Sequence, residues 1–238
     1  MQDATYVSPF QRVENAPSVE QANFYRKTYL TTGFSFLIWM MTVFGMFQTG
    51  IAYSLINAIT SVSWLVVLAI FWGASFLGGK LTFAEEKEKQ YLGLGIYILA
   101  YSLIFTPLIG IVIDYSGGVQ MAMDNVLIPA FIATCTIFAA LTVTVFVTKT
   151  DFSFLRSVVV FGSFIALGAI VIFTITGAAV GTWFAIAMII LMSAAILYET
   201  HRIKENFNTN QHIGAGAVLF ASFMTLLWYV ISLFMRRD

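Results

Sequence analysis

The sequence predicts an all-α integral membrane protein in which seven transmembrane helices form one bundle. Hydrophobic residues make up 59% of the 238 residues and charged residues only 10%, whereas a soluble domain carries about 25% charged residues. The chain also contains five long stretches without Asp, Glu, Lys or Arg. Each of them has at least the roughly 20 residues that a helix needs to cross a bilayer.

The five uncharged stretches divide into seven predicted spans. Thr28–Gly79 is long enough for two helices with a turn near Gly50, and Ser157–Tyr198 for two helices with a break at Gly177–Gly181. The other three stretches hold one helix each. Runs such as Trp64–Trp72 do not alternate between apolar and polar residues, which favours helices over a transmembrane barrel. The predicted spans are residues 28–49, 55–78, 91–113, 126–148, 155–176, 181–201 and 213–235.

Basic residues predict the orientation, because short cytoplasmic loops carry an excess of Lys and Arg. With a cytoplasmic N-terminus, only Arg236 and Arg237 lie outside. The basic residues on the inside are then Arg12, Arg26, Lys27, Lys80, Lys87, Lys89, Lys149, Arg156, Arg202 and Lys204. A re-entrant last helix would satisfy the same rule, but residues 213–235 are long enough to cross, so we expect seven full spans.

Residues 1–27 are expected to form a flexible cytoplasmic tail, followed by a transmembrane domain over residues 28–238. The first segment is polar and contains Pro9 and Pro17. We expect no cleavable signal before the first span, because a signal would begin with a short basic region rather than a long polar tail.

The residue types argue against an enzyme and against a bound cofactor. A zinc ion takes three or four protein ligands, and the chain has only His201, His212 and Cys135 as nitrogen or sulfur ligands. The sequence contains no HExxH or GxSxG motif and no phosphate-binding glycine loop. Twelve basic residues balance twelve acidic ones, so the charge does not indicate nucleic acid as a partner.

Three charged residues are candidates for a functional role. Glu199 ends the sixth predicted span, where a carboxylate is costly and burial would make it responsive to protons. Alternatively, it lies in the headgroup layer and pairs with Arg202, three residues on. Asp151 fits a helix cap or turn before the fifth span. Lys80 fits an anchor at the membrane interface or a partner for Glu199 across the bundle.

The last predicted span is rich in small residues. It opens with Gly214–Gly216 and continues with Ala217 and Ser222. Small residues let neighbouring helices approach closely, so this helix suits the centre of the bundle. Alternatively, the small residues reflect ordinary packing between membrane helices. The tryptophans, Trp39 and Trp228 among them, are expected to face lipid or the membrane interface.

Four segments occur in an order and spacing typical of one membrane protein family. They are Phe24–Tyr29 before the first span, Thr148–Leu155 before the fifth, Leu197–Ile203 at the end of the sixth and Ala217–Leu227 in the seventh. This pattern resembles the Bax inhibitor-1 family of transmembrane proteins, and it extends from about residue 20 to the end of the chain. The resemblance implies a seven-helix bundle with a central last helix, in a bacterial inner membrane.

The resemblance also implies a function, because some bacterial members are pH-sensitive calcium leak channels. Their sensor pairs an acid at the end of span six with an acid in span seven, and a basic residue from span two latches the pair. Glu199 matches the first acid, Ser222 falls where the second would be, and Lys80 is the counterpart of the latch. A carboxylate and a hydroxyl offer a hard cation fewer oxygens than two carboxylates and do not titrate as a coupled pair.

Two hypotheses for the function therefore remain open. In the first, the protein is a pH-sensitive cation leak channel involved in membrane homeostasis, and its partners are the lipid bilayer and calcium or another cation. In the second, it does not conduct ions and modulates a membrane-anchored ATP-dependent protease or another membrane complex, as some bacterial relatives do. The missing second acid favours the second hypothesis.

Overall fold

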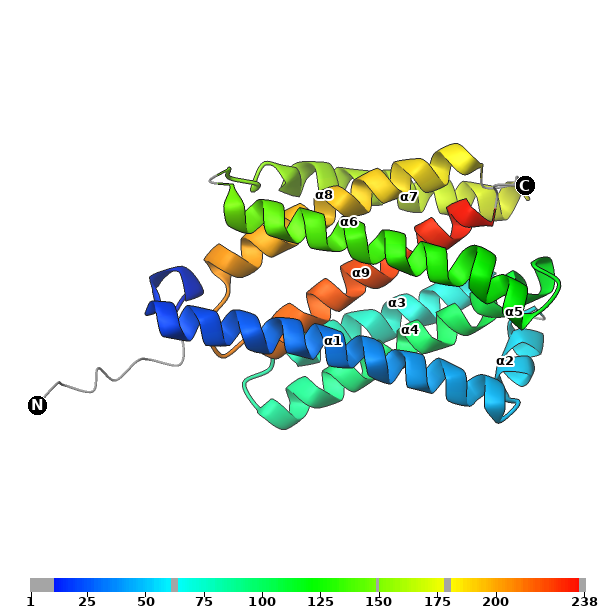
Figure 1. The fold of residues 1–238 in the computed structure, drawn as a ribbon, viewed down its shortest axis with the longest axis horizontal. Coiled ribbons are helices and arrows are strands. Elements are labelled where there is room, and N and C mark those ends of the chain that lie inside the picture. Colours follow the sequence, from blue (N-terminus) through cyan, green and yellow to red (C-terminus); the bar gives the residue numbers. More distant parts are fainter. Residues whose placement is uncertain (1–10, 61–63, 149, 178–180, 236–238) are drawn as a thin grey trace, which may run out of the picture.

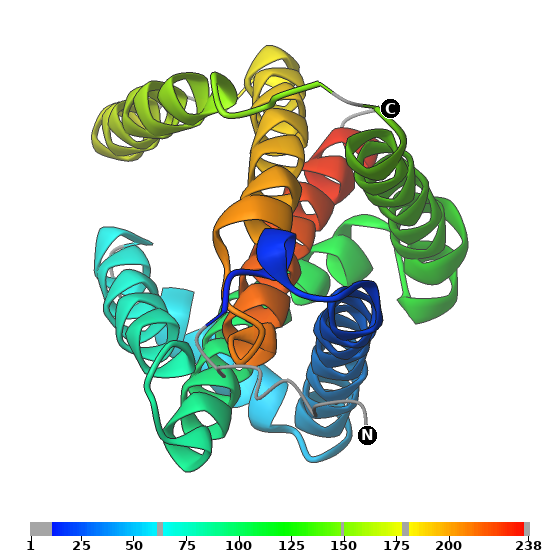
Figure 2. The ribbon, with the colours of Figure 1, turned by 90° about the vertical axis from the view of Figure 1, so that its left-hand side faces the viewer.

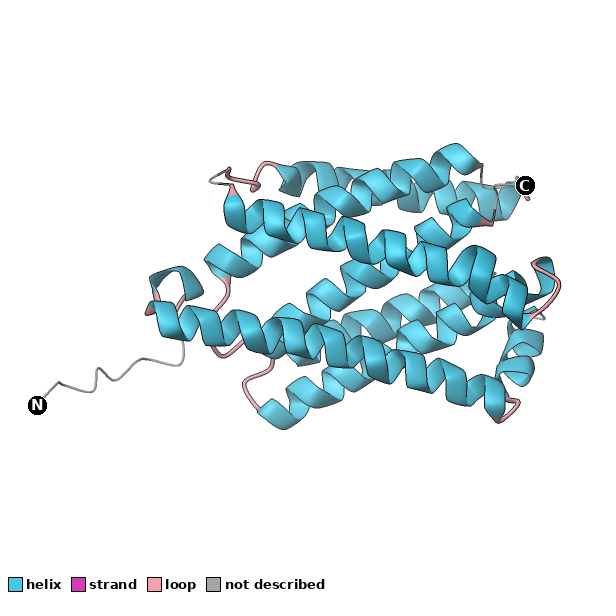
Figure 3. Ribbon diagram, in the orientation of Figure 1, coloured by secondary structure: helices cyan, strands magenta, loops and turns pink. Residues whose placement is uncertain are grey.

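The computed structural model describes residues 11–60, 64–148, 150–177 and 181–235, and these residues are almost entirely helical (Figures 1 and 3). Helices satisfy their backbone hydrogen bonds internally, as a membrane requires. A short 3₁₀ turn, Val13–Asn15, precedes the first helix. The helices are α1 (Ser18–Gln48), α2 (Ile51–Thr60), α3 (Trp64–Thr82), α4 (Lys87–Tyr115), α5 (Val119–Ala122), α6 (Ile128–Val147), α7 (Leu155–Thr176), α8 (Thr182–Asn206) and α9 (His212–Phe234).

The prediction of an all-α membrane bundle is confirmed. Seven helices in the described residues are long and apolar enough to cross a membrane. The fifth span has the predicted bounds, and it ends at Gly177, whose left-handed φ of 66° suits a glycine. The third, sixth and seventh spans differ from prediction by a few residues at their ends.

Two predicted spans have a different internal structure from the one expected. The second, predicted as one helix over residues 55–78, consists of the short helix α2 and the longer helix α3. Gly50, at a φ of 78°, turns the chain from α1 into α2. The fourth begins earlier than residue 126, because α5 continues through the π-helical turn Met123–Leu127 into α6.

Helix α9 lies at the centre of the bundle, as its small residues predicted. It packs against α1, α3, α4, α6 and α8 (Figure 2). In the most apolar stretch of α9, 50% of the residues are buried inside the protein, whereas in the corresponding stretch of α7 only 6% are buried. An added Cβ at Gly216 would lie 2.7 Å from Thr31 Cβ and 3.1 Å from the carbonyl oxygen of Thr28, both in α1. Close approach of α1 and α9 therefore depends on this glycine.

Helix α9 is continuous and runs the length of the bundle. Its 23 residues extend over about 35 Å at 1.5 Å per residue. The start of α1 and the end of α9 lie at opposite ends of the molecule (Figure 1). This arrangement favours a full crossing by the last helix over a re-entrant one. The direction of the bundle relative to the cytoplasm stays a prediction from the basic residues.

Residues 11–27 do not form the flexible tail that their polar composition suggested. Helix α1 begins at Ser18, ten residues before the predicted start. Val13 is fully buried, and its backbone N–H donates a 2.8 Å hydrogen bond to the carbonyl oxygen of Phe207. The chain thus pairs residues 11–13 with the loop between α8 and α9. Residues 1–10 of the predicted tail lie outside the described residues.

The tryptophans do not all face lipid. Trp39 of α1 is 5% exposed, and its ring packs edge to face against Phe105 at a centroid distance of 5.2 Å. Trp228 of α9 makes a similar edge-to-face contact with Phe105 at 5.3 Å. Both rings therefore belong to the interior of the bundle, which composition alone did not indicate.

Candidate functional site

The end of α8 brings together the charged side chains of the predicted sixth span. Helix α8 continues five residues past the predicted end at 201. It includes Arg202–Asn206, and the backbone becomes extended at Phe207. Lys204 in the last turn complements the negative end of the helix dipole. Residues three and four apart lie on one face, so Glu199 shares a face with Arg202, and His201 with Glu205.

Glu199 is largely buried and has one counter-charge. Its side chain is 17% exposed, and its Oε2 lies 3.3 Å from Nε of Arg202. This contact is an ion pair without good hydrogen-bond alignment, because Oε2 accepts no hydrogen bond within the described residues. The Arg202 guanidinium also lies over the rings of Tyr198 and Phe207, 5.9 Å and 5.2 Å from their centroids. These rings hold the arginine beside the carboxylate.

Two tyrosines of α4 extend from Glu199 toward the middle of the bundle. Tyr97 is close enough to Glu199 for the charge of the carboxylate to act on its hydroxyl group. The rings of Tyr97 and Tyr101 lie 5.8 Å apart, one helical turn from each other. The Tyr101 hydroxyl lies 3.3 Å from both the Ala221 carbonyl oxygen and Thr225 Oγ1 of α9. Tyr101 thus contacts the central helix directly, and Tyr97 lies one helical turn from it, within range of the charge of Glu199.

Ser222 and Lys80 form no polar interaction with Glu199. Ser222 is half-buried on α9, next to Ala221, and Lys80 is exposed in the last turn of α3. Among the residues that the structure describes, neither side chain forms a hydrogen bond or ion pair with the carboxylate. The structure therefore joins Glu199 to Arg202, as the second interpretation predicted, while keeping it largely buried, as the first required.

Asp151 lies in the loop between α6 and α7 and contacts His201. The Ser153 backbone N–H donates a 2.8 Å hydrogen bond to Asp151 Oδ1, which closes the predicted turn. The same oxygen lies 2.9 Å from His201 Nε2, and Glu205 Oε2 lies 3.1 Å from that nitrogen. The imidazole is 5% exposed, whereas the two carboxylates are 72% and 42% exposed. Phe152 packs edge to face on the ring at 6.1 Å.

The contacts of His201 are electrostatic rather than well-aligned hydrogen bonds. Within the described residues, Nε2 has two carboxylate oxygens nearby but no hydrogen bond of good geometry. Both acids approach one nitrogen, and the described residues contain no group of three or more His, Cys, Asp or Glu side chains suited to a metal ion. The cluster instead fastens the α6–α7 loop to the end of α8.

We expect acid to release the α6–α7 loop. The Ser153 N–H that donates to Asp151 holds the pKa of that carboxyl below its ordinary value, and the nearby His201 acts in the same direction. Because the Asp151 carboxyl has a lower pKa in the folded loop than in the unfolded chain, the ionised carboxylate stabilises the folded loop above the unfolded-state pKa of about 3.9. This stabilisation is lost as the pH falls through the pKa of the folded state. Hydrogen exchange at Ser153 should therefore speed up, after correction for intrinsic rates, only below about pH 4.

A matched variant gives the control for this prediction. In Asp151→Ala, Ser153 should exchange rapidly at neutral pH and show no further acid-dependent increase. Equal protection of Ser153 in the variant and the wild type at neutral pH would contradict this role for Asp151.

Sequence reasoning missed the surroundings of both acids. The His201–Glu205 pair could have been found from its spacing of four residues on one helix. The approach of Asp151 to His201 and of Tyr97 to Glu199 joins segments that are distant in sequence, so no local sequence pattern indicates either contact.

Together, the fold and the site define a multi-pass α-helical membrane protein with a charged cluster at the end of its sixth span. Residues 21–238 match the family model described as inhibitor of apoptosis-promoting Bax1. The chain belongs to the Bax inhibitor-1 family, as the order of its four characteristic segments predicted. The comparison with curated proteins found no match.

Proposed function

We propose that this protein is a pH-sensitive cation leak in the inner membrane, with calcium as the expected cation and a role in membrane homeostasis. Its N-terminus lies in the cytoplasm in this proposal. The observation that carries the proposal is the state of Glu199: a carboxylate with 17% exposure, within a bundle of apolar helices, that keeps an oxygen without a hydrogen bond. A buried acidic group of this kind is a default functional candidate in a membrane protein.

The proposed mechanism depends on the charge of Glu199. The ionised carboxylate attracts a cation to the inner mouth of the bundle, where Arg202 competes for the same oxygen at 3.3 Å. Proton binding removes this attraction and slows the leak. Ser222 would offer a hydroxyl oxygen from α9, and Lys80 would set the depth of α3 at the membrane interface. Asp151 would keep the α6–α7 loop against α8 through His201.

Calcium efflux from reconstituted vesicles tests this proposal. Purified protein in liposomes loaded with calcium should release it faster than protein-free liposomes, and the rate should rise as the pH increases. The pH has to be changed on both sides of the membrane, because both orientations are present after reconstitution. Efflux equal to that of protein-free liposomes at every pH would overturn the proposal.

A second candidate function is that of a non-conducting interaction protein, which modulates a membrane-anchored ATP-dependent protease or another membrane complex. The packing of residues 11–13 against the α8–α9 loop supports it, because this segment presents a fixed surface to a partner. The presence of Ser222 at the position of a second acid supports it as well. A stoichiometric membrane partner in a mild-detergent pull-down, without any calcium efflux, would favour this function over the leak.

A further inference from the structure

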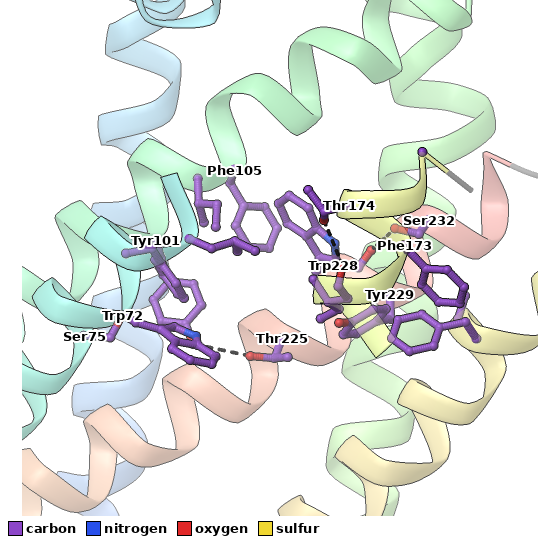
Figure 4. Close-up of a pocket in the computed structure, with 17 residues that line it drawn as sticks. Trp72, Ser75, Tyr101, Phe105, Phe173, Thr174, Thr225, Trp228, Tyr229 and Ser232 are labelled. Carbon is purple, nitrogen blue, oxygen red and sulfur yellow. Dashed lines mark hydrogen bonds between the residues drawn. The ribbon is translucent and has the colours of Figure 1, made fainter. Parts of the chain in front are cut away.

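A cavity of about 780 Å³ lies between α3, α4, α7, α8 and α9 (Figure 4). This volume is within the range of about 300–1,000 Å³ typical of small-molecule sites. Besides residues of α3 and α4, the lining consists of residues from the second half of α9, the end of α7 and the start of α8. The cavity is therefore in the half of the bundle away from Glu199, which lies near the end of α8.

The walls of the cavity suit a flat apolar molecule. Large aromatic side chains dominate the lining, and among the described residues no charged side chain contributes to it. Such walls bind aromatic rings by stacked and edge-to-face contacts, and they offer a hydrated cation no charged group in exchange for its water. The aromatic residues are Phe71, Trp72, Tyr101, Phe105, Phe173, Phe184, Trp228 and Tyr229.

The cavity opens sideways toward the surrounding lipid. Its two flanks, α3 and α7, barely touch each other, and Figure 2 shows them on the same side of the bundle. Trp72 lines the cavity and is also 50% exposed on the outer surface of α3, so it marks the mouth. Neighbouring residues on the two flanks, Phe76 and Ile172, are exposed and apolar. A ligand would therefore enter from the membrane.

Two hydroxyl groups in the lining are available to a ligand. Ser75 Oγ is buried and has no hydrogen-bond partner within the described residues. The other serine and threonine hydroxyls donate to carbonyl oxygens of their own helices, as Thr174, Thr225 and Ser232 do. The Tyr229 hydroxyl also makes no hydrogen bond to a described residue, and it lies on the opposite side of the cavity from Ser75 (Figure 4).

We propose that this cavity binds a membrane-soluble quinone, whose ring lies among the aromatic side chains and whose two carbonyl oxygens accept hydrogen bonds from Ser75 and Tyr229. A quinone combines a flat ring, two acceptors on opposite edges and an apolar tail that extends through the mouth into the lipid. A hydrocarbon chain would fill the same space but would leave both hydroxyls without partners. This site is separate from Glu199, and its occupancy does not require ion conduction.

Tryptophan fluorescence in reconstituted vesicles tests the proposal, because Trp72 and Trp228 line the cavity. The probe is a benzoquinone with a saturated alkyl tail, and the comparison ligand is a benzene ring with the same tail. The quinone should quench a saturable fraction of the emission, and the alkylbenzene should fail to displace it at equal concentration. Ser75→Ala and Tyr229→Phe should each weaken quinone binding up to about tenfold, the equivalent of one hydrogen bond.

Both variants remove an oxygen that is not bonded within the described residues, so the fold should persist. Ser193→Ala is the matched control, because Ser193 lies outside the cavity and donates to the Ile189 carbonyl oxygen at 2.8 Å. Its quinone affinity should equal that of the wild type. Linear, non-saturable quenching, or equal affinities in all variants, would overturn the proposal.

Discussion

Replacing Gly93 with alanine is expected to destabilise the protein by about 1–3 kcal/mol, the usual cost of overpacking. A Cβ atom at this position would lie 2.7 Å from the Gly78 carbonyl oxygen and 2.7 Å from the Thr82 backbone nitrogen. Both are backbone atoms of α3, so no side chain can rotate to make room, and α3 and α4 would have to separate. Thermal unfolding in mild detergent should show a midpoint lower by roughly 2–4 °C for each kcal/mol.

Gly95 provides the matched control on the same helix. A Cβ at Gly95 would meet no atom within 4 Å, and alanine favours a helix over glycine by about 1 kcal/mol. Gly95→Ala should therefore leave the midpoint unchanged or raise it. If Gly93→Ala were as stable as Gly95→Ala, the close contact between α3 and α4 would not contribute as described. Because Tyr97 follows Gly93 by one turn, this contact also positions the tyrosine beside Glu199.

Glu199→Gln is expected to abolish the pH dependence of calcium efflux. Glutamine has the shape of the protonated acid but never ionises, so the variant should leak at the slow, low-pH rate throughout the range from about pH 5 to about pH 8. The wild type should pass from this slow rate to a faster one within the same range. Efflux from calcium-loaded vesicles, measured at equal protein density, gives both profiles.

Glu205→Gln separates this effect from a general loss of charge on α8. Glu205 is 42% exposed and contacts His201 rather than Arg202. Its removal should leave the pH profile of efflux unchanged. A Glu199→Gln profile that followed the wild type would remove Glu199 from the mechanism, whereas parallel changes in both variants would point to surface charge as the cause.

The two acids have different surroundings. The side chain of Glu199 is largely buried, while Asp151 reaches the buried ring of His201 from an exposed loop. The first arrangement places a charge where solvent access is limited. The second fastens a loop without burying a carboxylate, which avoids the desolvation cost of a buried ion pair.

The sequence by itself determined the number of spans and their approximate positions. The thickness of the bilayer demands long uncharged stretches, and a charge or a glycine-rich break ends each one; residues 155–176 have the same bounds in the structure as in the prediction. The small residues of the last span also predicted its central place. The candidate acid at Glu199 was found in the same way, because a carboxylate directly at the end of a long apolar run is easily recognised.

Only the tertiary structure decided which side of each helix faces protein and which faces lipid. Lipid tails are as apolar as leucine, so a helix in a membrane needs no polar outer face, and α7 and α9 are both apolar although their burial differs greatly. For the same reason the interior position of Trp39 and Trp228, the cavity beside α9 and the packing of Val13 left no local signal. They result from contacts between segments that are distant in sequence, which hydrophobicity along the chain does not encode.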